Sequence, residues 1–551
     1  MKKLLTAICV LCFFLAFLCQ RPASRVLPQV KLTDTALLVP LDSSPVCSTM
    51  VQQIASLAGL EVILPPKALL DNYRQPADRE KLCQWLQKNA NNYPYKVIST
   101  DLLLHGGLLA TRTATATKEE EQRVWDTLAA LQPKEGVATD STAIFSVIPR
   151  LLVSDDLYPD CWYQFHLMRY SQLLDMVEIS NNPVYTKKLL EYQEEIPHDV
   201  LQKYITRFHH SQAFNSKLLQ SKYGYTVIGQ DDSSPLGLPH RSARALETLL
   251  AREQLTDAAI TYGADEIAVL LMTRHILQKQ NYQPKIFLQF ATPAAEFKHL
   301  PYMACSTGAA LRNQIELLGA REASNAKTAD IICYIYCGDA DKGELPSVQQ
   351  ANAVKDLLAT GKPIALVDSS ANYEAQELLL PFLLEQNVPV QRLAAYAGWN
   401  TFSNSSGTAL AQACTFTAGL RRLHRQQADT LQLAGLYAAN LRLNVLRMLD
   451  DYYYQKRIHP QLRPYLESFG VTPTDLSEEE KLEVEQYIQG RLSLYAVYLE
   501  YRLSREPFYK NYRVNSITVG ARLPWSRIFE VELNPEIKVM SVVKEARTER
   551  I

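Results

Sequence analysis

An acidic pair, Asp265 and Glu266, follows a short apolar run, Ala258 to Ile260, and a glycine, Gly263. Neighbouring carboxylates repel each other when both are ionised, so the pKa of one of them rises. Enzymes use such a raised pKa to keep a carboxylic acid protonated near neutral pH. The pair therefore predicts catalytic carboxylates, with Glu266 as the general acid. The alternative interpretation is structural, because the same residues would suit the capped first turn of a helix from Glu266 to Leu277.

A second acidic pair follows another apolar run. Gln230, Asp231 and Asp232 come directly after it, and His240 lies close behind. Such a density of polar side chains rarely serves packing alone. Asp231 and Asp232 would bind sugar hydroxyls, hold a divalent cation, or supply the second carboxylate of a hydrolase. We predict both as catalytic candidates, with Gln230 and His240 in substrate binding.

Two early segments add candidates for substrate binding. Asp42 ends an apolar run, although it would also serve as the cap of the helix that follows. Asp101 and His105 flank a turn that ends in two glycines, which permit close approach of a ligand to the backbone, and Arg112 follows. Together Asp, His and Arg suit the recognition of sugar hydroxyls or of a carboxylate. The alternative is a capped turn broken by glycine.

The segment from Tyr396 to Asn404 combines aromatic and amide side chains. Trp399 would stack on a sugar ring while Asn400 and Asn404 bind its hydroxyls or an N-acetyl group. The alternative is a buried Trp at a turn with Asn as a helix cap. Asp368 ends the preceding apolar run and is a further candidate. A charged cluster at residues 450–457 would close over the site or form a solvated helix face.

Short apolar runs alternate with helical patterns over most of the chain, which is typical of a parallel sheet with helical crossovers. The predicted strands are 36–40, 60–64, 96–100, 143–148, 225–229, 258–261, 285–290, 331–336, 364–367 and 393–397. Polar residues follow most of these runs, at the edge where parallel α/β folds build their sites. We predict an α/β fold, barrel-like as the first choice, with an open doubly wound sheet or two such sheets in tandem as the alternative.

Three divisions of the chain are expected. Residues 1–31 contain a signal sequence or membrane anchor and a linker, because two lysines precede an apolar run from Leu4 to Cys19. Residues 32–407 form the α/β domain, with a helical insertion at about 155–222, and residues 408–551 are mainly helical with a strand-like tail at 525–533. The chain is therefore expected to be exported. Its 57 basic and 58 acidic residues leave a net charge of -1, which argues against a nucleic-acid partner.

Two resemblances follow from these motifs. Gly263, Ala264, Asp265, Glu266 and Ile267 are similar to the motif of retaining β-N-acetylhexosaminidases, although Thr261 stands where that motif has His or Asn. Over about residues 37–533, the chain resembles the bacterial family catalogued as domain of unknown function 4127. The segments that carry this likeness are 37–42, 99–107, 229–232, 263–266, 395–401 and 524–525. Ser44 and Leu236 replace an Arg and a Tyr of that family's pattern, and the family implies no mechanism.

These observations favour an exported glycoside hydrolase that acts on amino-sugar or related glycans. A membrane-anchored, non-catalytic glycan-binding protein is one alternative. A metal-dependent hydrolase that uses Asp42, Asp101, His105 and Asp231 is another. The sequence contains no GxGxxG segment, P-loop or zinc motif, so we expect no cofactor.

Overall fold

The computed structural model describes residues 25–112, 115–131, 142–152, 162–221 and 223–541. The predicted signal segment, Leu4 to Cys19, lies outside the described residues. Within them, no helix combines the length and the apolar character that crossing a membrane requires.

The first half of the chain forms a parallel six-stranded sheet in the order β2-β1-β3-β4-β5-β6. Its strands are β1 (Asp34–Val39), β2 (Leu60–Ile63), β3 (Tyr95–Ser99), β4 (Thr142–Ile148), β5 (Tyr225–Gln230) and β6 (Ala258–Tyr262). Every residue of β3 and β4 is buried, as expected for strands covered by helices on both faces.

A second parallel sheet follows in the order β11-β10-β9-β7-β8. Its strands are β7 (Lys285–Phe290), β8 (Arg321–Glu322), β9 (Ile331–Gly338), β10 (Ile364–Ser370) and β11 (Ala395–Ala397). In each sheet the first strand lies inside and the second at the edge, which is the order of flavodoxin-like doubly wound folds. The alternative of two doubly wound sheets in tandem is thus confirmed. A barrel does not form because β6 remains an edge strand and does not pair with β7.

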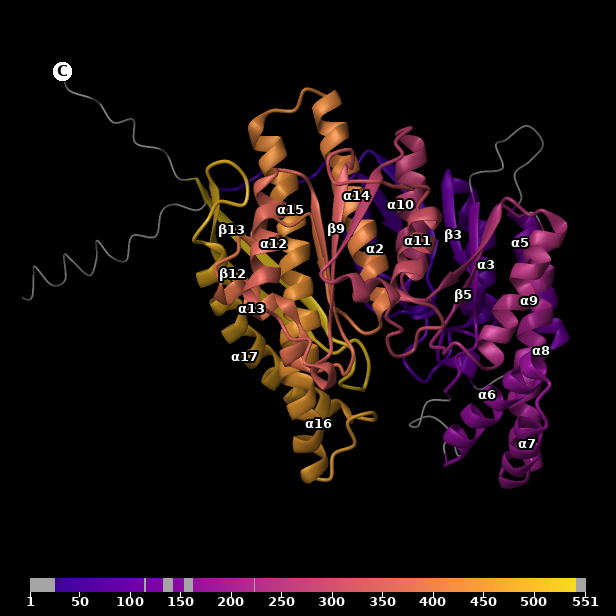
Figure 1. The fold of residues 1–551 in the computed structure, drawn as a ribbon. Coiled ribbons are helices and arrows are strands. Elements are labelled where there is room, and N and C mark those ends of the chain that lie inside the picture. The colour runs from indigo at the N-terminus through magenta and orange to yellow at the C-terminus, as the bar shows by residue number, and fades with distance from the viewer. Residues whose placement is uncertain (1–24, 113–114, 132–141, 153–161, 222, 542–551) are drawn as a thin grey trace, which may run out of the picture.

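Four helices lie between the two sheets and join them into one molecule (Figure 1). They are α2 (Thr49–Ser56), α10 (Ile267–Lys279), α11 (Thr307–Leu317) and α14 (Phe402–Arg425). The side chains of α14 are buried without interruption from Phe402 to Gly419, because the helix is covered on all sides. One core cluster contains residues of both sheets and of these helices.

Other helices cover the outer faces. On the first sheet these include α3 (Arg79–Asn89), α5 (Lys118–Ala130) and α9 (Leu238–Glu253), and on the second α12 (Val348–Ala359) and α13 (Leu379–Glu385). The predicted helical insertion is present between β4 and β5. It comprises α6 (Gln164–Ser180), α7 (Pro183–Glu195) and α8 (His198–Gln220).

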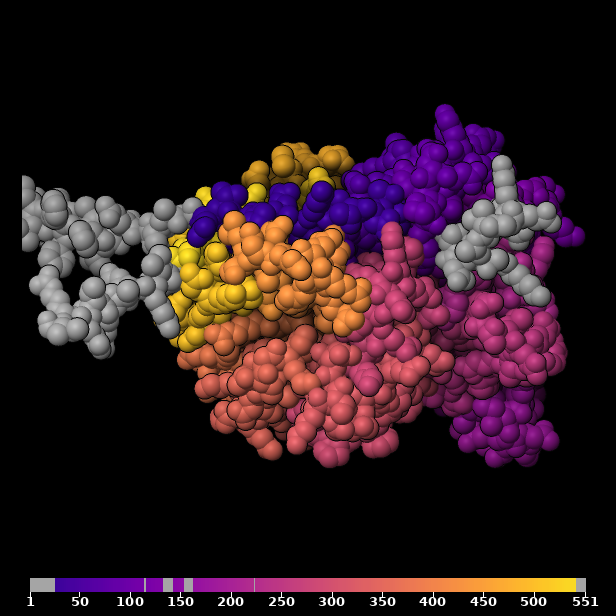
Figure 2. All heavy atoms as spheres, turned by 90° about the horizontal axis from the view of Figure 1, so that it is seen from above, coloured from indigo at the N-terminus to yellow at the C-terminus, as the bar shows by residue number. Residues whose placement is uncertain are grey.

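The C-terminal region is mainly helical, as predicted. It contains α15 (Thr430–Arg447), a π-helical stretch (Met448–Ile458), α16 (His459–Ser468), α17 (Glu478–Leu503) and a hairpin of β12 (Tyr512–Arg522) and β13 (Glu532–Ser541). The prediction of a strand at 525–533 is wrong, because residues 525–531 belong to the loop that joins β12 to β13 and only residues 532 and 533 lie in a strand. The first described residues, in indigo, lie against this yellow hairpin, where Arg25 N donates to Val539 O at 2.7 Å (Figure 2).

Candidate functional site

A cavity of about 320 Å³ lies at the carboxyl ends of β5 and β6. The loop after β1, the start of α14 and the β12–β13 loop complete its wall. Nine of the residues predicted for substrate binding or catalysis line it: Asp42, Arg112, Gln230, Asp231, Asp232, Asp265, Trp399, Asn400 and Asn404. Residues more than 350 positions apart therefore meet in one cavity, at the sheet edge where doubly wound folds bind ligands.

Six predicted residues are not among those that line this cavity: Glu266, Asp101, His105, His240, Asp368 and Tyr396. Asp101 and His105 border a separate space of about 20 Å³ on the α8 side of the sheet. There Asp101 Oδ2 accepts a hydrogen bond from Val147 N, and burial lowers the pKa of His105 to about 3. His240 is half-buried on α9.

Asp368 and Tyr396 are fully buried in the second sheet. The Asp368 carboxylate accepts hydrogen bonds from Leu379 N at 2.7 Å and Leu380 N at 2.9 Å, at the start of α13. The Tyr396 hydroxyl lies 3.4 Å from Asp368 Oδ2. Both residues therefore hold this helix to the sheet, and neither reaches the cavity.

Asp265 is the cavity carboxylate with the most perturbed pKa. Burial raises its pKa well above the usual range, and the charges of Asp42, Asp231, Glu266 and Asp232 raise it further. The described residues place no Arg or Lys within 4 Å of it, and its hydrogen bonds come from Asn404 Nδ2 at 3.2 Å and from Cys47 Sγ at 3.9 Å. These surroundings therefore favour the neutral, proton-donating form of the Asp265 carboxyl group.

Glu266 is buried beneath the cavity and does not line it. Its carboxylate accepts hydrogen bonds from Asn404 Nδ2 at 3.0 Å and from Gln314 Nε2 at 3.3 Å, and burial raises its pKa to about 7. The side chain forms no cap at the start of α10, so the capping interpretation does not hold for it. A β-carbon on Gly263 would fall 1.9 Å from Glu266 Oε1, and one on Gly407 2.5 Å from Glu266 Cγ. These two glycines make the space that Glu266 occupies.

Pairs of arginine and carboxylate side chains line the rest of the cavity. Arg150 Nη2 lies 2.9 Å from Asp232 Oδ2, and Arg112 Nη2 lies 3.6 Å from Asp231 Oδ2. The C-terminal region adds Arg527, whose Nε donates to Glu530 Oε2 at 2.6 Å. Arg527 and Glu530 come from a loop where the sequence predicts a strand, so neither residue was predicted for the site.

Asp42 is fixed by its own loop. Ser44 N donates to Asp42 Oδ1 at 3.0 Å, and the Ser44 hydroxyl donates to the same oxygen at 2.5 Å. Behind it, Asp71 Oδ1 accepts a hydrogen bond from Ser43 N at 2.7 Å. Burial, and then the charge of Asp42, raise the pKa of Asp71 to about 8. Asp71 was not predicted, because it follows no predicted strand.

Aromatic side chains border the cavity, but Trp399 differs from the expectation of an exposed sugar-stacking face. It is 8% exposed and packs in the hydrophobic core, and α14 begins beside it with a capping box of Thr401 and Asn404. This burial and capping are what the structural alternative predicts, although Trp399 and Asn404 also line the cavity. Tyr302 is 42% exposed and supplies a more accessible ring.

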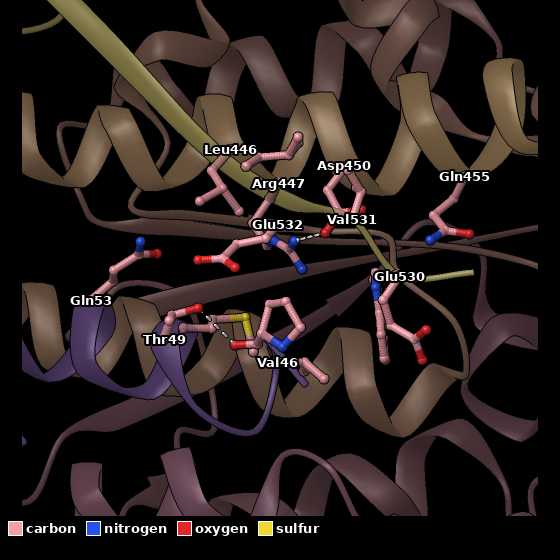
Figure 3. A pocket seen from close by; sticks show the side chains of 14 residues that line it. Val46, Thr49, Gln53, Leu446, Arg447, Asp450, Gln455, Glu530, Val531 and Glu532 are labelled. Carbon is pink, nitrogen blue, oxygen red and sulfur yellow. Dashed lines mark hydrogen bonds and ion pairs between the residues drawn. The ribbon is translucent and has the colours of Figure 1, made fainter. Parts of the chain in front are cut away.

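A smaller space of about 30 Å³ lies next to the cavity and shares Val46, Trp399 and Glu530 with it. Figure 3 shows the side chains that line this smaller space. Arg447 points toward Asp450 there and also lies 3.1 Å from Asp451 Oδ1. Within the cluster at 450–457, Asp450 and Asp451 thus pair with Arg447. Tyr454 and Gln455 instead donate hydrogen bonds to Ile528 O and Phe529 O, in the β12–β13 loop that walls the cavity.

The described residues contain no group of three or more His, Cys, Asp or Glu arranged to hold a metal ion. The four residues of the metal-dependent alternative are divided between two spaces, since Asp42 and Asp231 line the cavity whereas Asp101 and His105 border the small one.

Fold and cavity together define a tandem doubly wound α/β protein with a carboxylate-rich cavity at the carboxyl ends of β5 and β6. The chain belongs to the family described as "Protein of unknown function (DUF4127)", whose model matches residues 36–534. This confirms the family resemblance seen in the sequence, whereas the likeness to hexosaminidases is not shown. Comparisons with curated proteins and with solved structures found no match.

Proposed function

We propose that this chain is an exported glycoside hydrolase in which Asp265 protonates the glycosidic oxygen and Asp42 supplies the second carboxylate. The observation that carries the proposal is that Asp265 and Asp42 line one cavity but lie in different electrostatic surroundings. Asp265 has no cationic partner within 4 Å among the described residues, and its pKa is raised, whereas Asp42 accepts two hydrogen bonds from Ser44. Two carboxyl groups whose environments differ in this way are the usual acid and base of glycoside hydrolysis.

The lining of the cavity supports a sugar as the ligand. Its volume, about 320 Å³, suits one or two sugar rings, and its polar groups are matched to hydroxyls rather than to a lipid. The exposed Asn400 side chain borders it, where its amide can bind an N-acetyl group. Tyr302 supplies a ring for stacking at 42% exposure.

Glu266, first predicted as the general acid, becomes a positioning residue in this mechanism. Glu266 does not reach the cavity, but it accepts a hydrogen bond from the same Asn404 amide that donates to Asp265. Asp231 is the alternative second carboxylate, because it also lines the cavity and its charge also raises the pKa of Asp265.

The test uses aryl glycosides of N-acetylhexosamines that differ only in the leaving group. A good leaving group departs without a proton, so Asp265→Asn should lose roughly 10²–10⁴-fold in rate on poor leaving groups and far less on good ones. Asp42→Asn should lose activity on both kinds. Asp356→Asn, on the exposed side of α12, is the matched control and should behave as the wild type.

Equal losses on both leaving groups for Asp265→Asn would remove Asp265 as the acid. Sugar binding by the wild type without any turnover would instead favour the non-catalytic glycan-binding alternative.

A further inference from the structure

The side chain of Arg112 lines the cavity and has no hydrogen-bonding partner among the described residues. It is 11% exposed, and its closest carboxylate oxygen, Asp231 Oδ2, is 3.6 Å from Nη2, too far for a good hydrogen bond. Its Nε is buried and also lacks a partner among the described residues. Buried guanidinium groups are normally hydrogen-bonded, because unsatisfied charged donors cost free energy.

The neighbouring arginines are better satisfied. Arg150 is 2.9 Å from Asp232. Arg527 makes two contacts with Glu530 and lies over the ring of Tyr73, 4.4 Å from its centroid. The Nε of Arg150 is, like that of Arg112, buried without a partner among the described residues. Arg112 differs from both neighbours in having no carboxylate oxygen within good hydrogen-bond distance.

The electrostatic surroundings of Arg112 are consistent with an anion site. Burial is the main cause that lowers its pKa, and the positive charges of Arg150 and Arg527 lower it further against the opposing charges of Asp231 and Asp232. An added anion would offset this repulsion. A carboxylate suits the position best, because its two oxygens match two parallel donors of a guanidinium and it adds a single negative charge to a wall that already holds Asp231 and Asp232.

We propose that Arg112, assisted by Arg150, forms a subsite for a carboxylate carried by the sugar, so that the preferred substrates are acidic glycans. The sugar part of this inference rests on the proposed function, whereas the anion site does not. Hydrolysis of a uronate-containing glycan would then place its carboxylate on Arg112 and its glycosidic oxygen at Asp265, both of which line the same cavity.

The first experiment uses the carboxylate alone. Thermal melts of the full chain in sodium acetate are compared with melts in sodium chloride at equal ionic strength. Acetate should raise the melting temperature of the wild type and of Arg252→Gln, an exposed control on α9, but not that of Arg112→Gln. Equal acetate effects in the wild type and in Arg112→Gln would overturn the anion site. Arg112→Lys keeps the charge without the planar fork, so it should retain part of the effect and serves if the Gln variant does not fold.

The second experiment uses matched sugars. Binding of glucuronate, galacturonate and mannuronate is measured beside the corresponding neutral hexoses by calorimetry. At least one uronate should bind tenfold or more tightly than its hexose, and Arg112→Gln should remove most of that preference. Neutral hexoses that bind as well as the uronates would overturn the acidic substrate class and leave the proposed hydrolase in place. Uronates that bind no better than acetate would support the anion site but overturn the acidic-glycan preference, and the leaving-group series on N-acetylhexosamine glycosides tests the glycosidase separately.

Discussion

Asp265 and Glu266 are consecutive in the chain, yet one faces the cavity and the other lies beneath it, and a single amide joins them. Asn404 Nδ2 is 3.2 Å from Asp265 Oδ2 and 3.0 Å from Glu266 Oε2. The pKa of each carboxyl group is raised by burial, and the charge of Glu266 contributes to the shift of Asp265. Glu266 therefore influences the proton affinity of Asp265 without contact with the ligand.

Replacing Glu266 by Gln should change how stability depends on pH. Burial raises the pKa of Glu266 to about 7. Because the folded state binds this proton more tightly than the unfolded state, Glu266 lowers the free energy of unfolding as pH rises from about 4 to about 7. Its stabilising contribution is full below this range and lost above it. Glu266→Gln cannot ionise, so between about pH 4 and about pH 8 it should lose less stability than the wild type, by up to about 3 kcal/mol.

Urea unfolding of both proteins across this pH range measures the effect. Asp101 and Asp368 also have pKa values raised to about 7 by burial, but they are present in both proteins and cancel in the difference. Parallel curves for the wild type and Glu266→Gln would show that Glu266 is not protonated in the folded protein.

Gly407→Ala should destabilise the protein, because the added methyl group would lie 2.5 Å from Glu266 Cγ in the middle of the buried helix α14. Overpacking of this kind costs about 1–3 kcal/mol. Gly490→Ala is the matched control, since no atom lies within 4 Å of its added methyl group on α17. That change should stabilise the protein by up to about 1 kcal/mol. Melting temperatures of the two variants separate these outcomes, and equal shifts would contradict the packing of Glu266 against Gly407.

Asp368→Ala should reduce stability without affecting ligand binding. The substitution leaves Leu379 N and Leu380 N, two buried donors, without their acceptor. The expected cost is about 1–3 kcal/mol. Calorimetric titration with the sugar that the wild type binds measures the second half of this prediction. A clear loss of affinity in a folded variant would show that Asp368 contributes to ligand binding.

The sequence predicted the strands well because each is a short apolar run bounded by polar residues, and ten of the eleven parallel strands lie at or beside the predicted runs. The exception is β8, which has two exposed residues and no apolar pattern. Periodicity does not report which strands pair, so it could not decide between a barrel and two open sheets.

Part of the site was predictable for a related reason. In a parallel sheet, residues that follow the strands meet at one edge, which brought Asp42, Asp231 and Asp265 into one cavity. The depth of a side chain was not predictable, since Glu266 is buried by Gly407, which lies 141 positions later in the sequence. Arg527 and Glu530 could not be found either, because they reach the cavity from a loop of the C-terminal hairpin.

Trp399→Ala should destabilise the protein strongly, because Trp399 is 8% exposed and packs in the core cluster that joins both sheets. Truncation of a buried Trp to Ala typically costs about 3–5 kcal/mol. The matched control is Trp162→Ala, since Trp162 is 83% exposed and its loss should change the melting temperature little. Thermal melts are run with and without a candidate sugar. A large fall in melting temperature without sugar would confirm that Trp399 is chiefly a packing residue, and stacking against the ligand would then fall to Tyr302. A normal melting temperature combined with weakened sugar binding would instead show that the Trp399 ring is available to the ligand in solution.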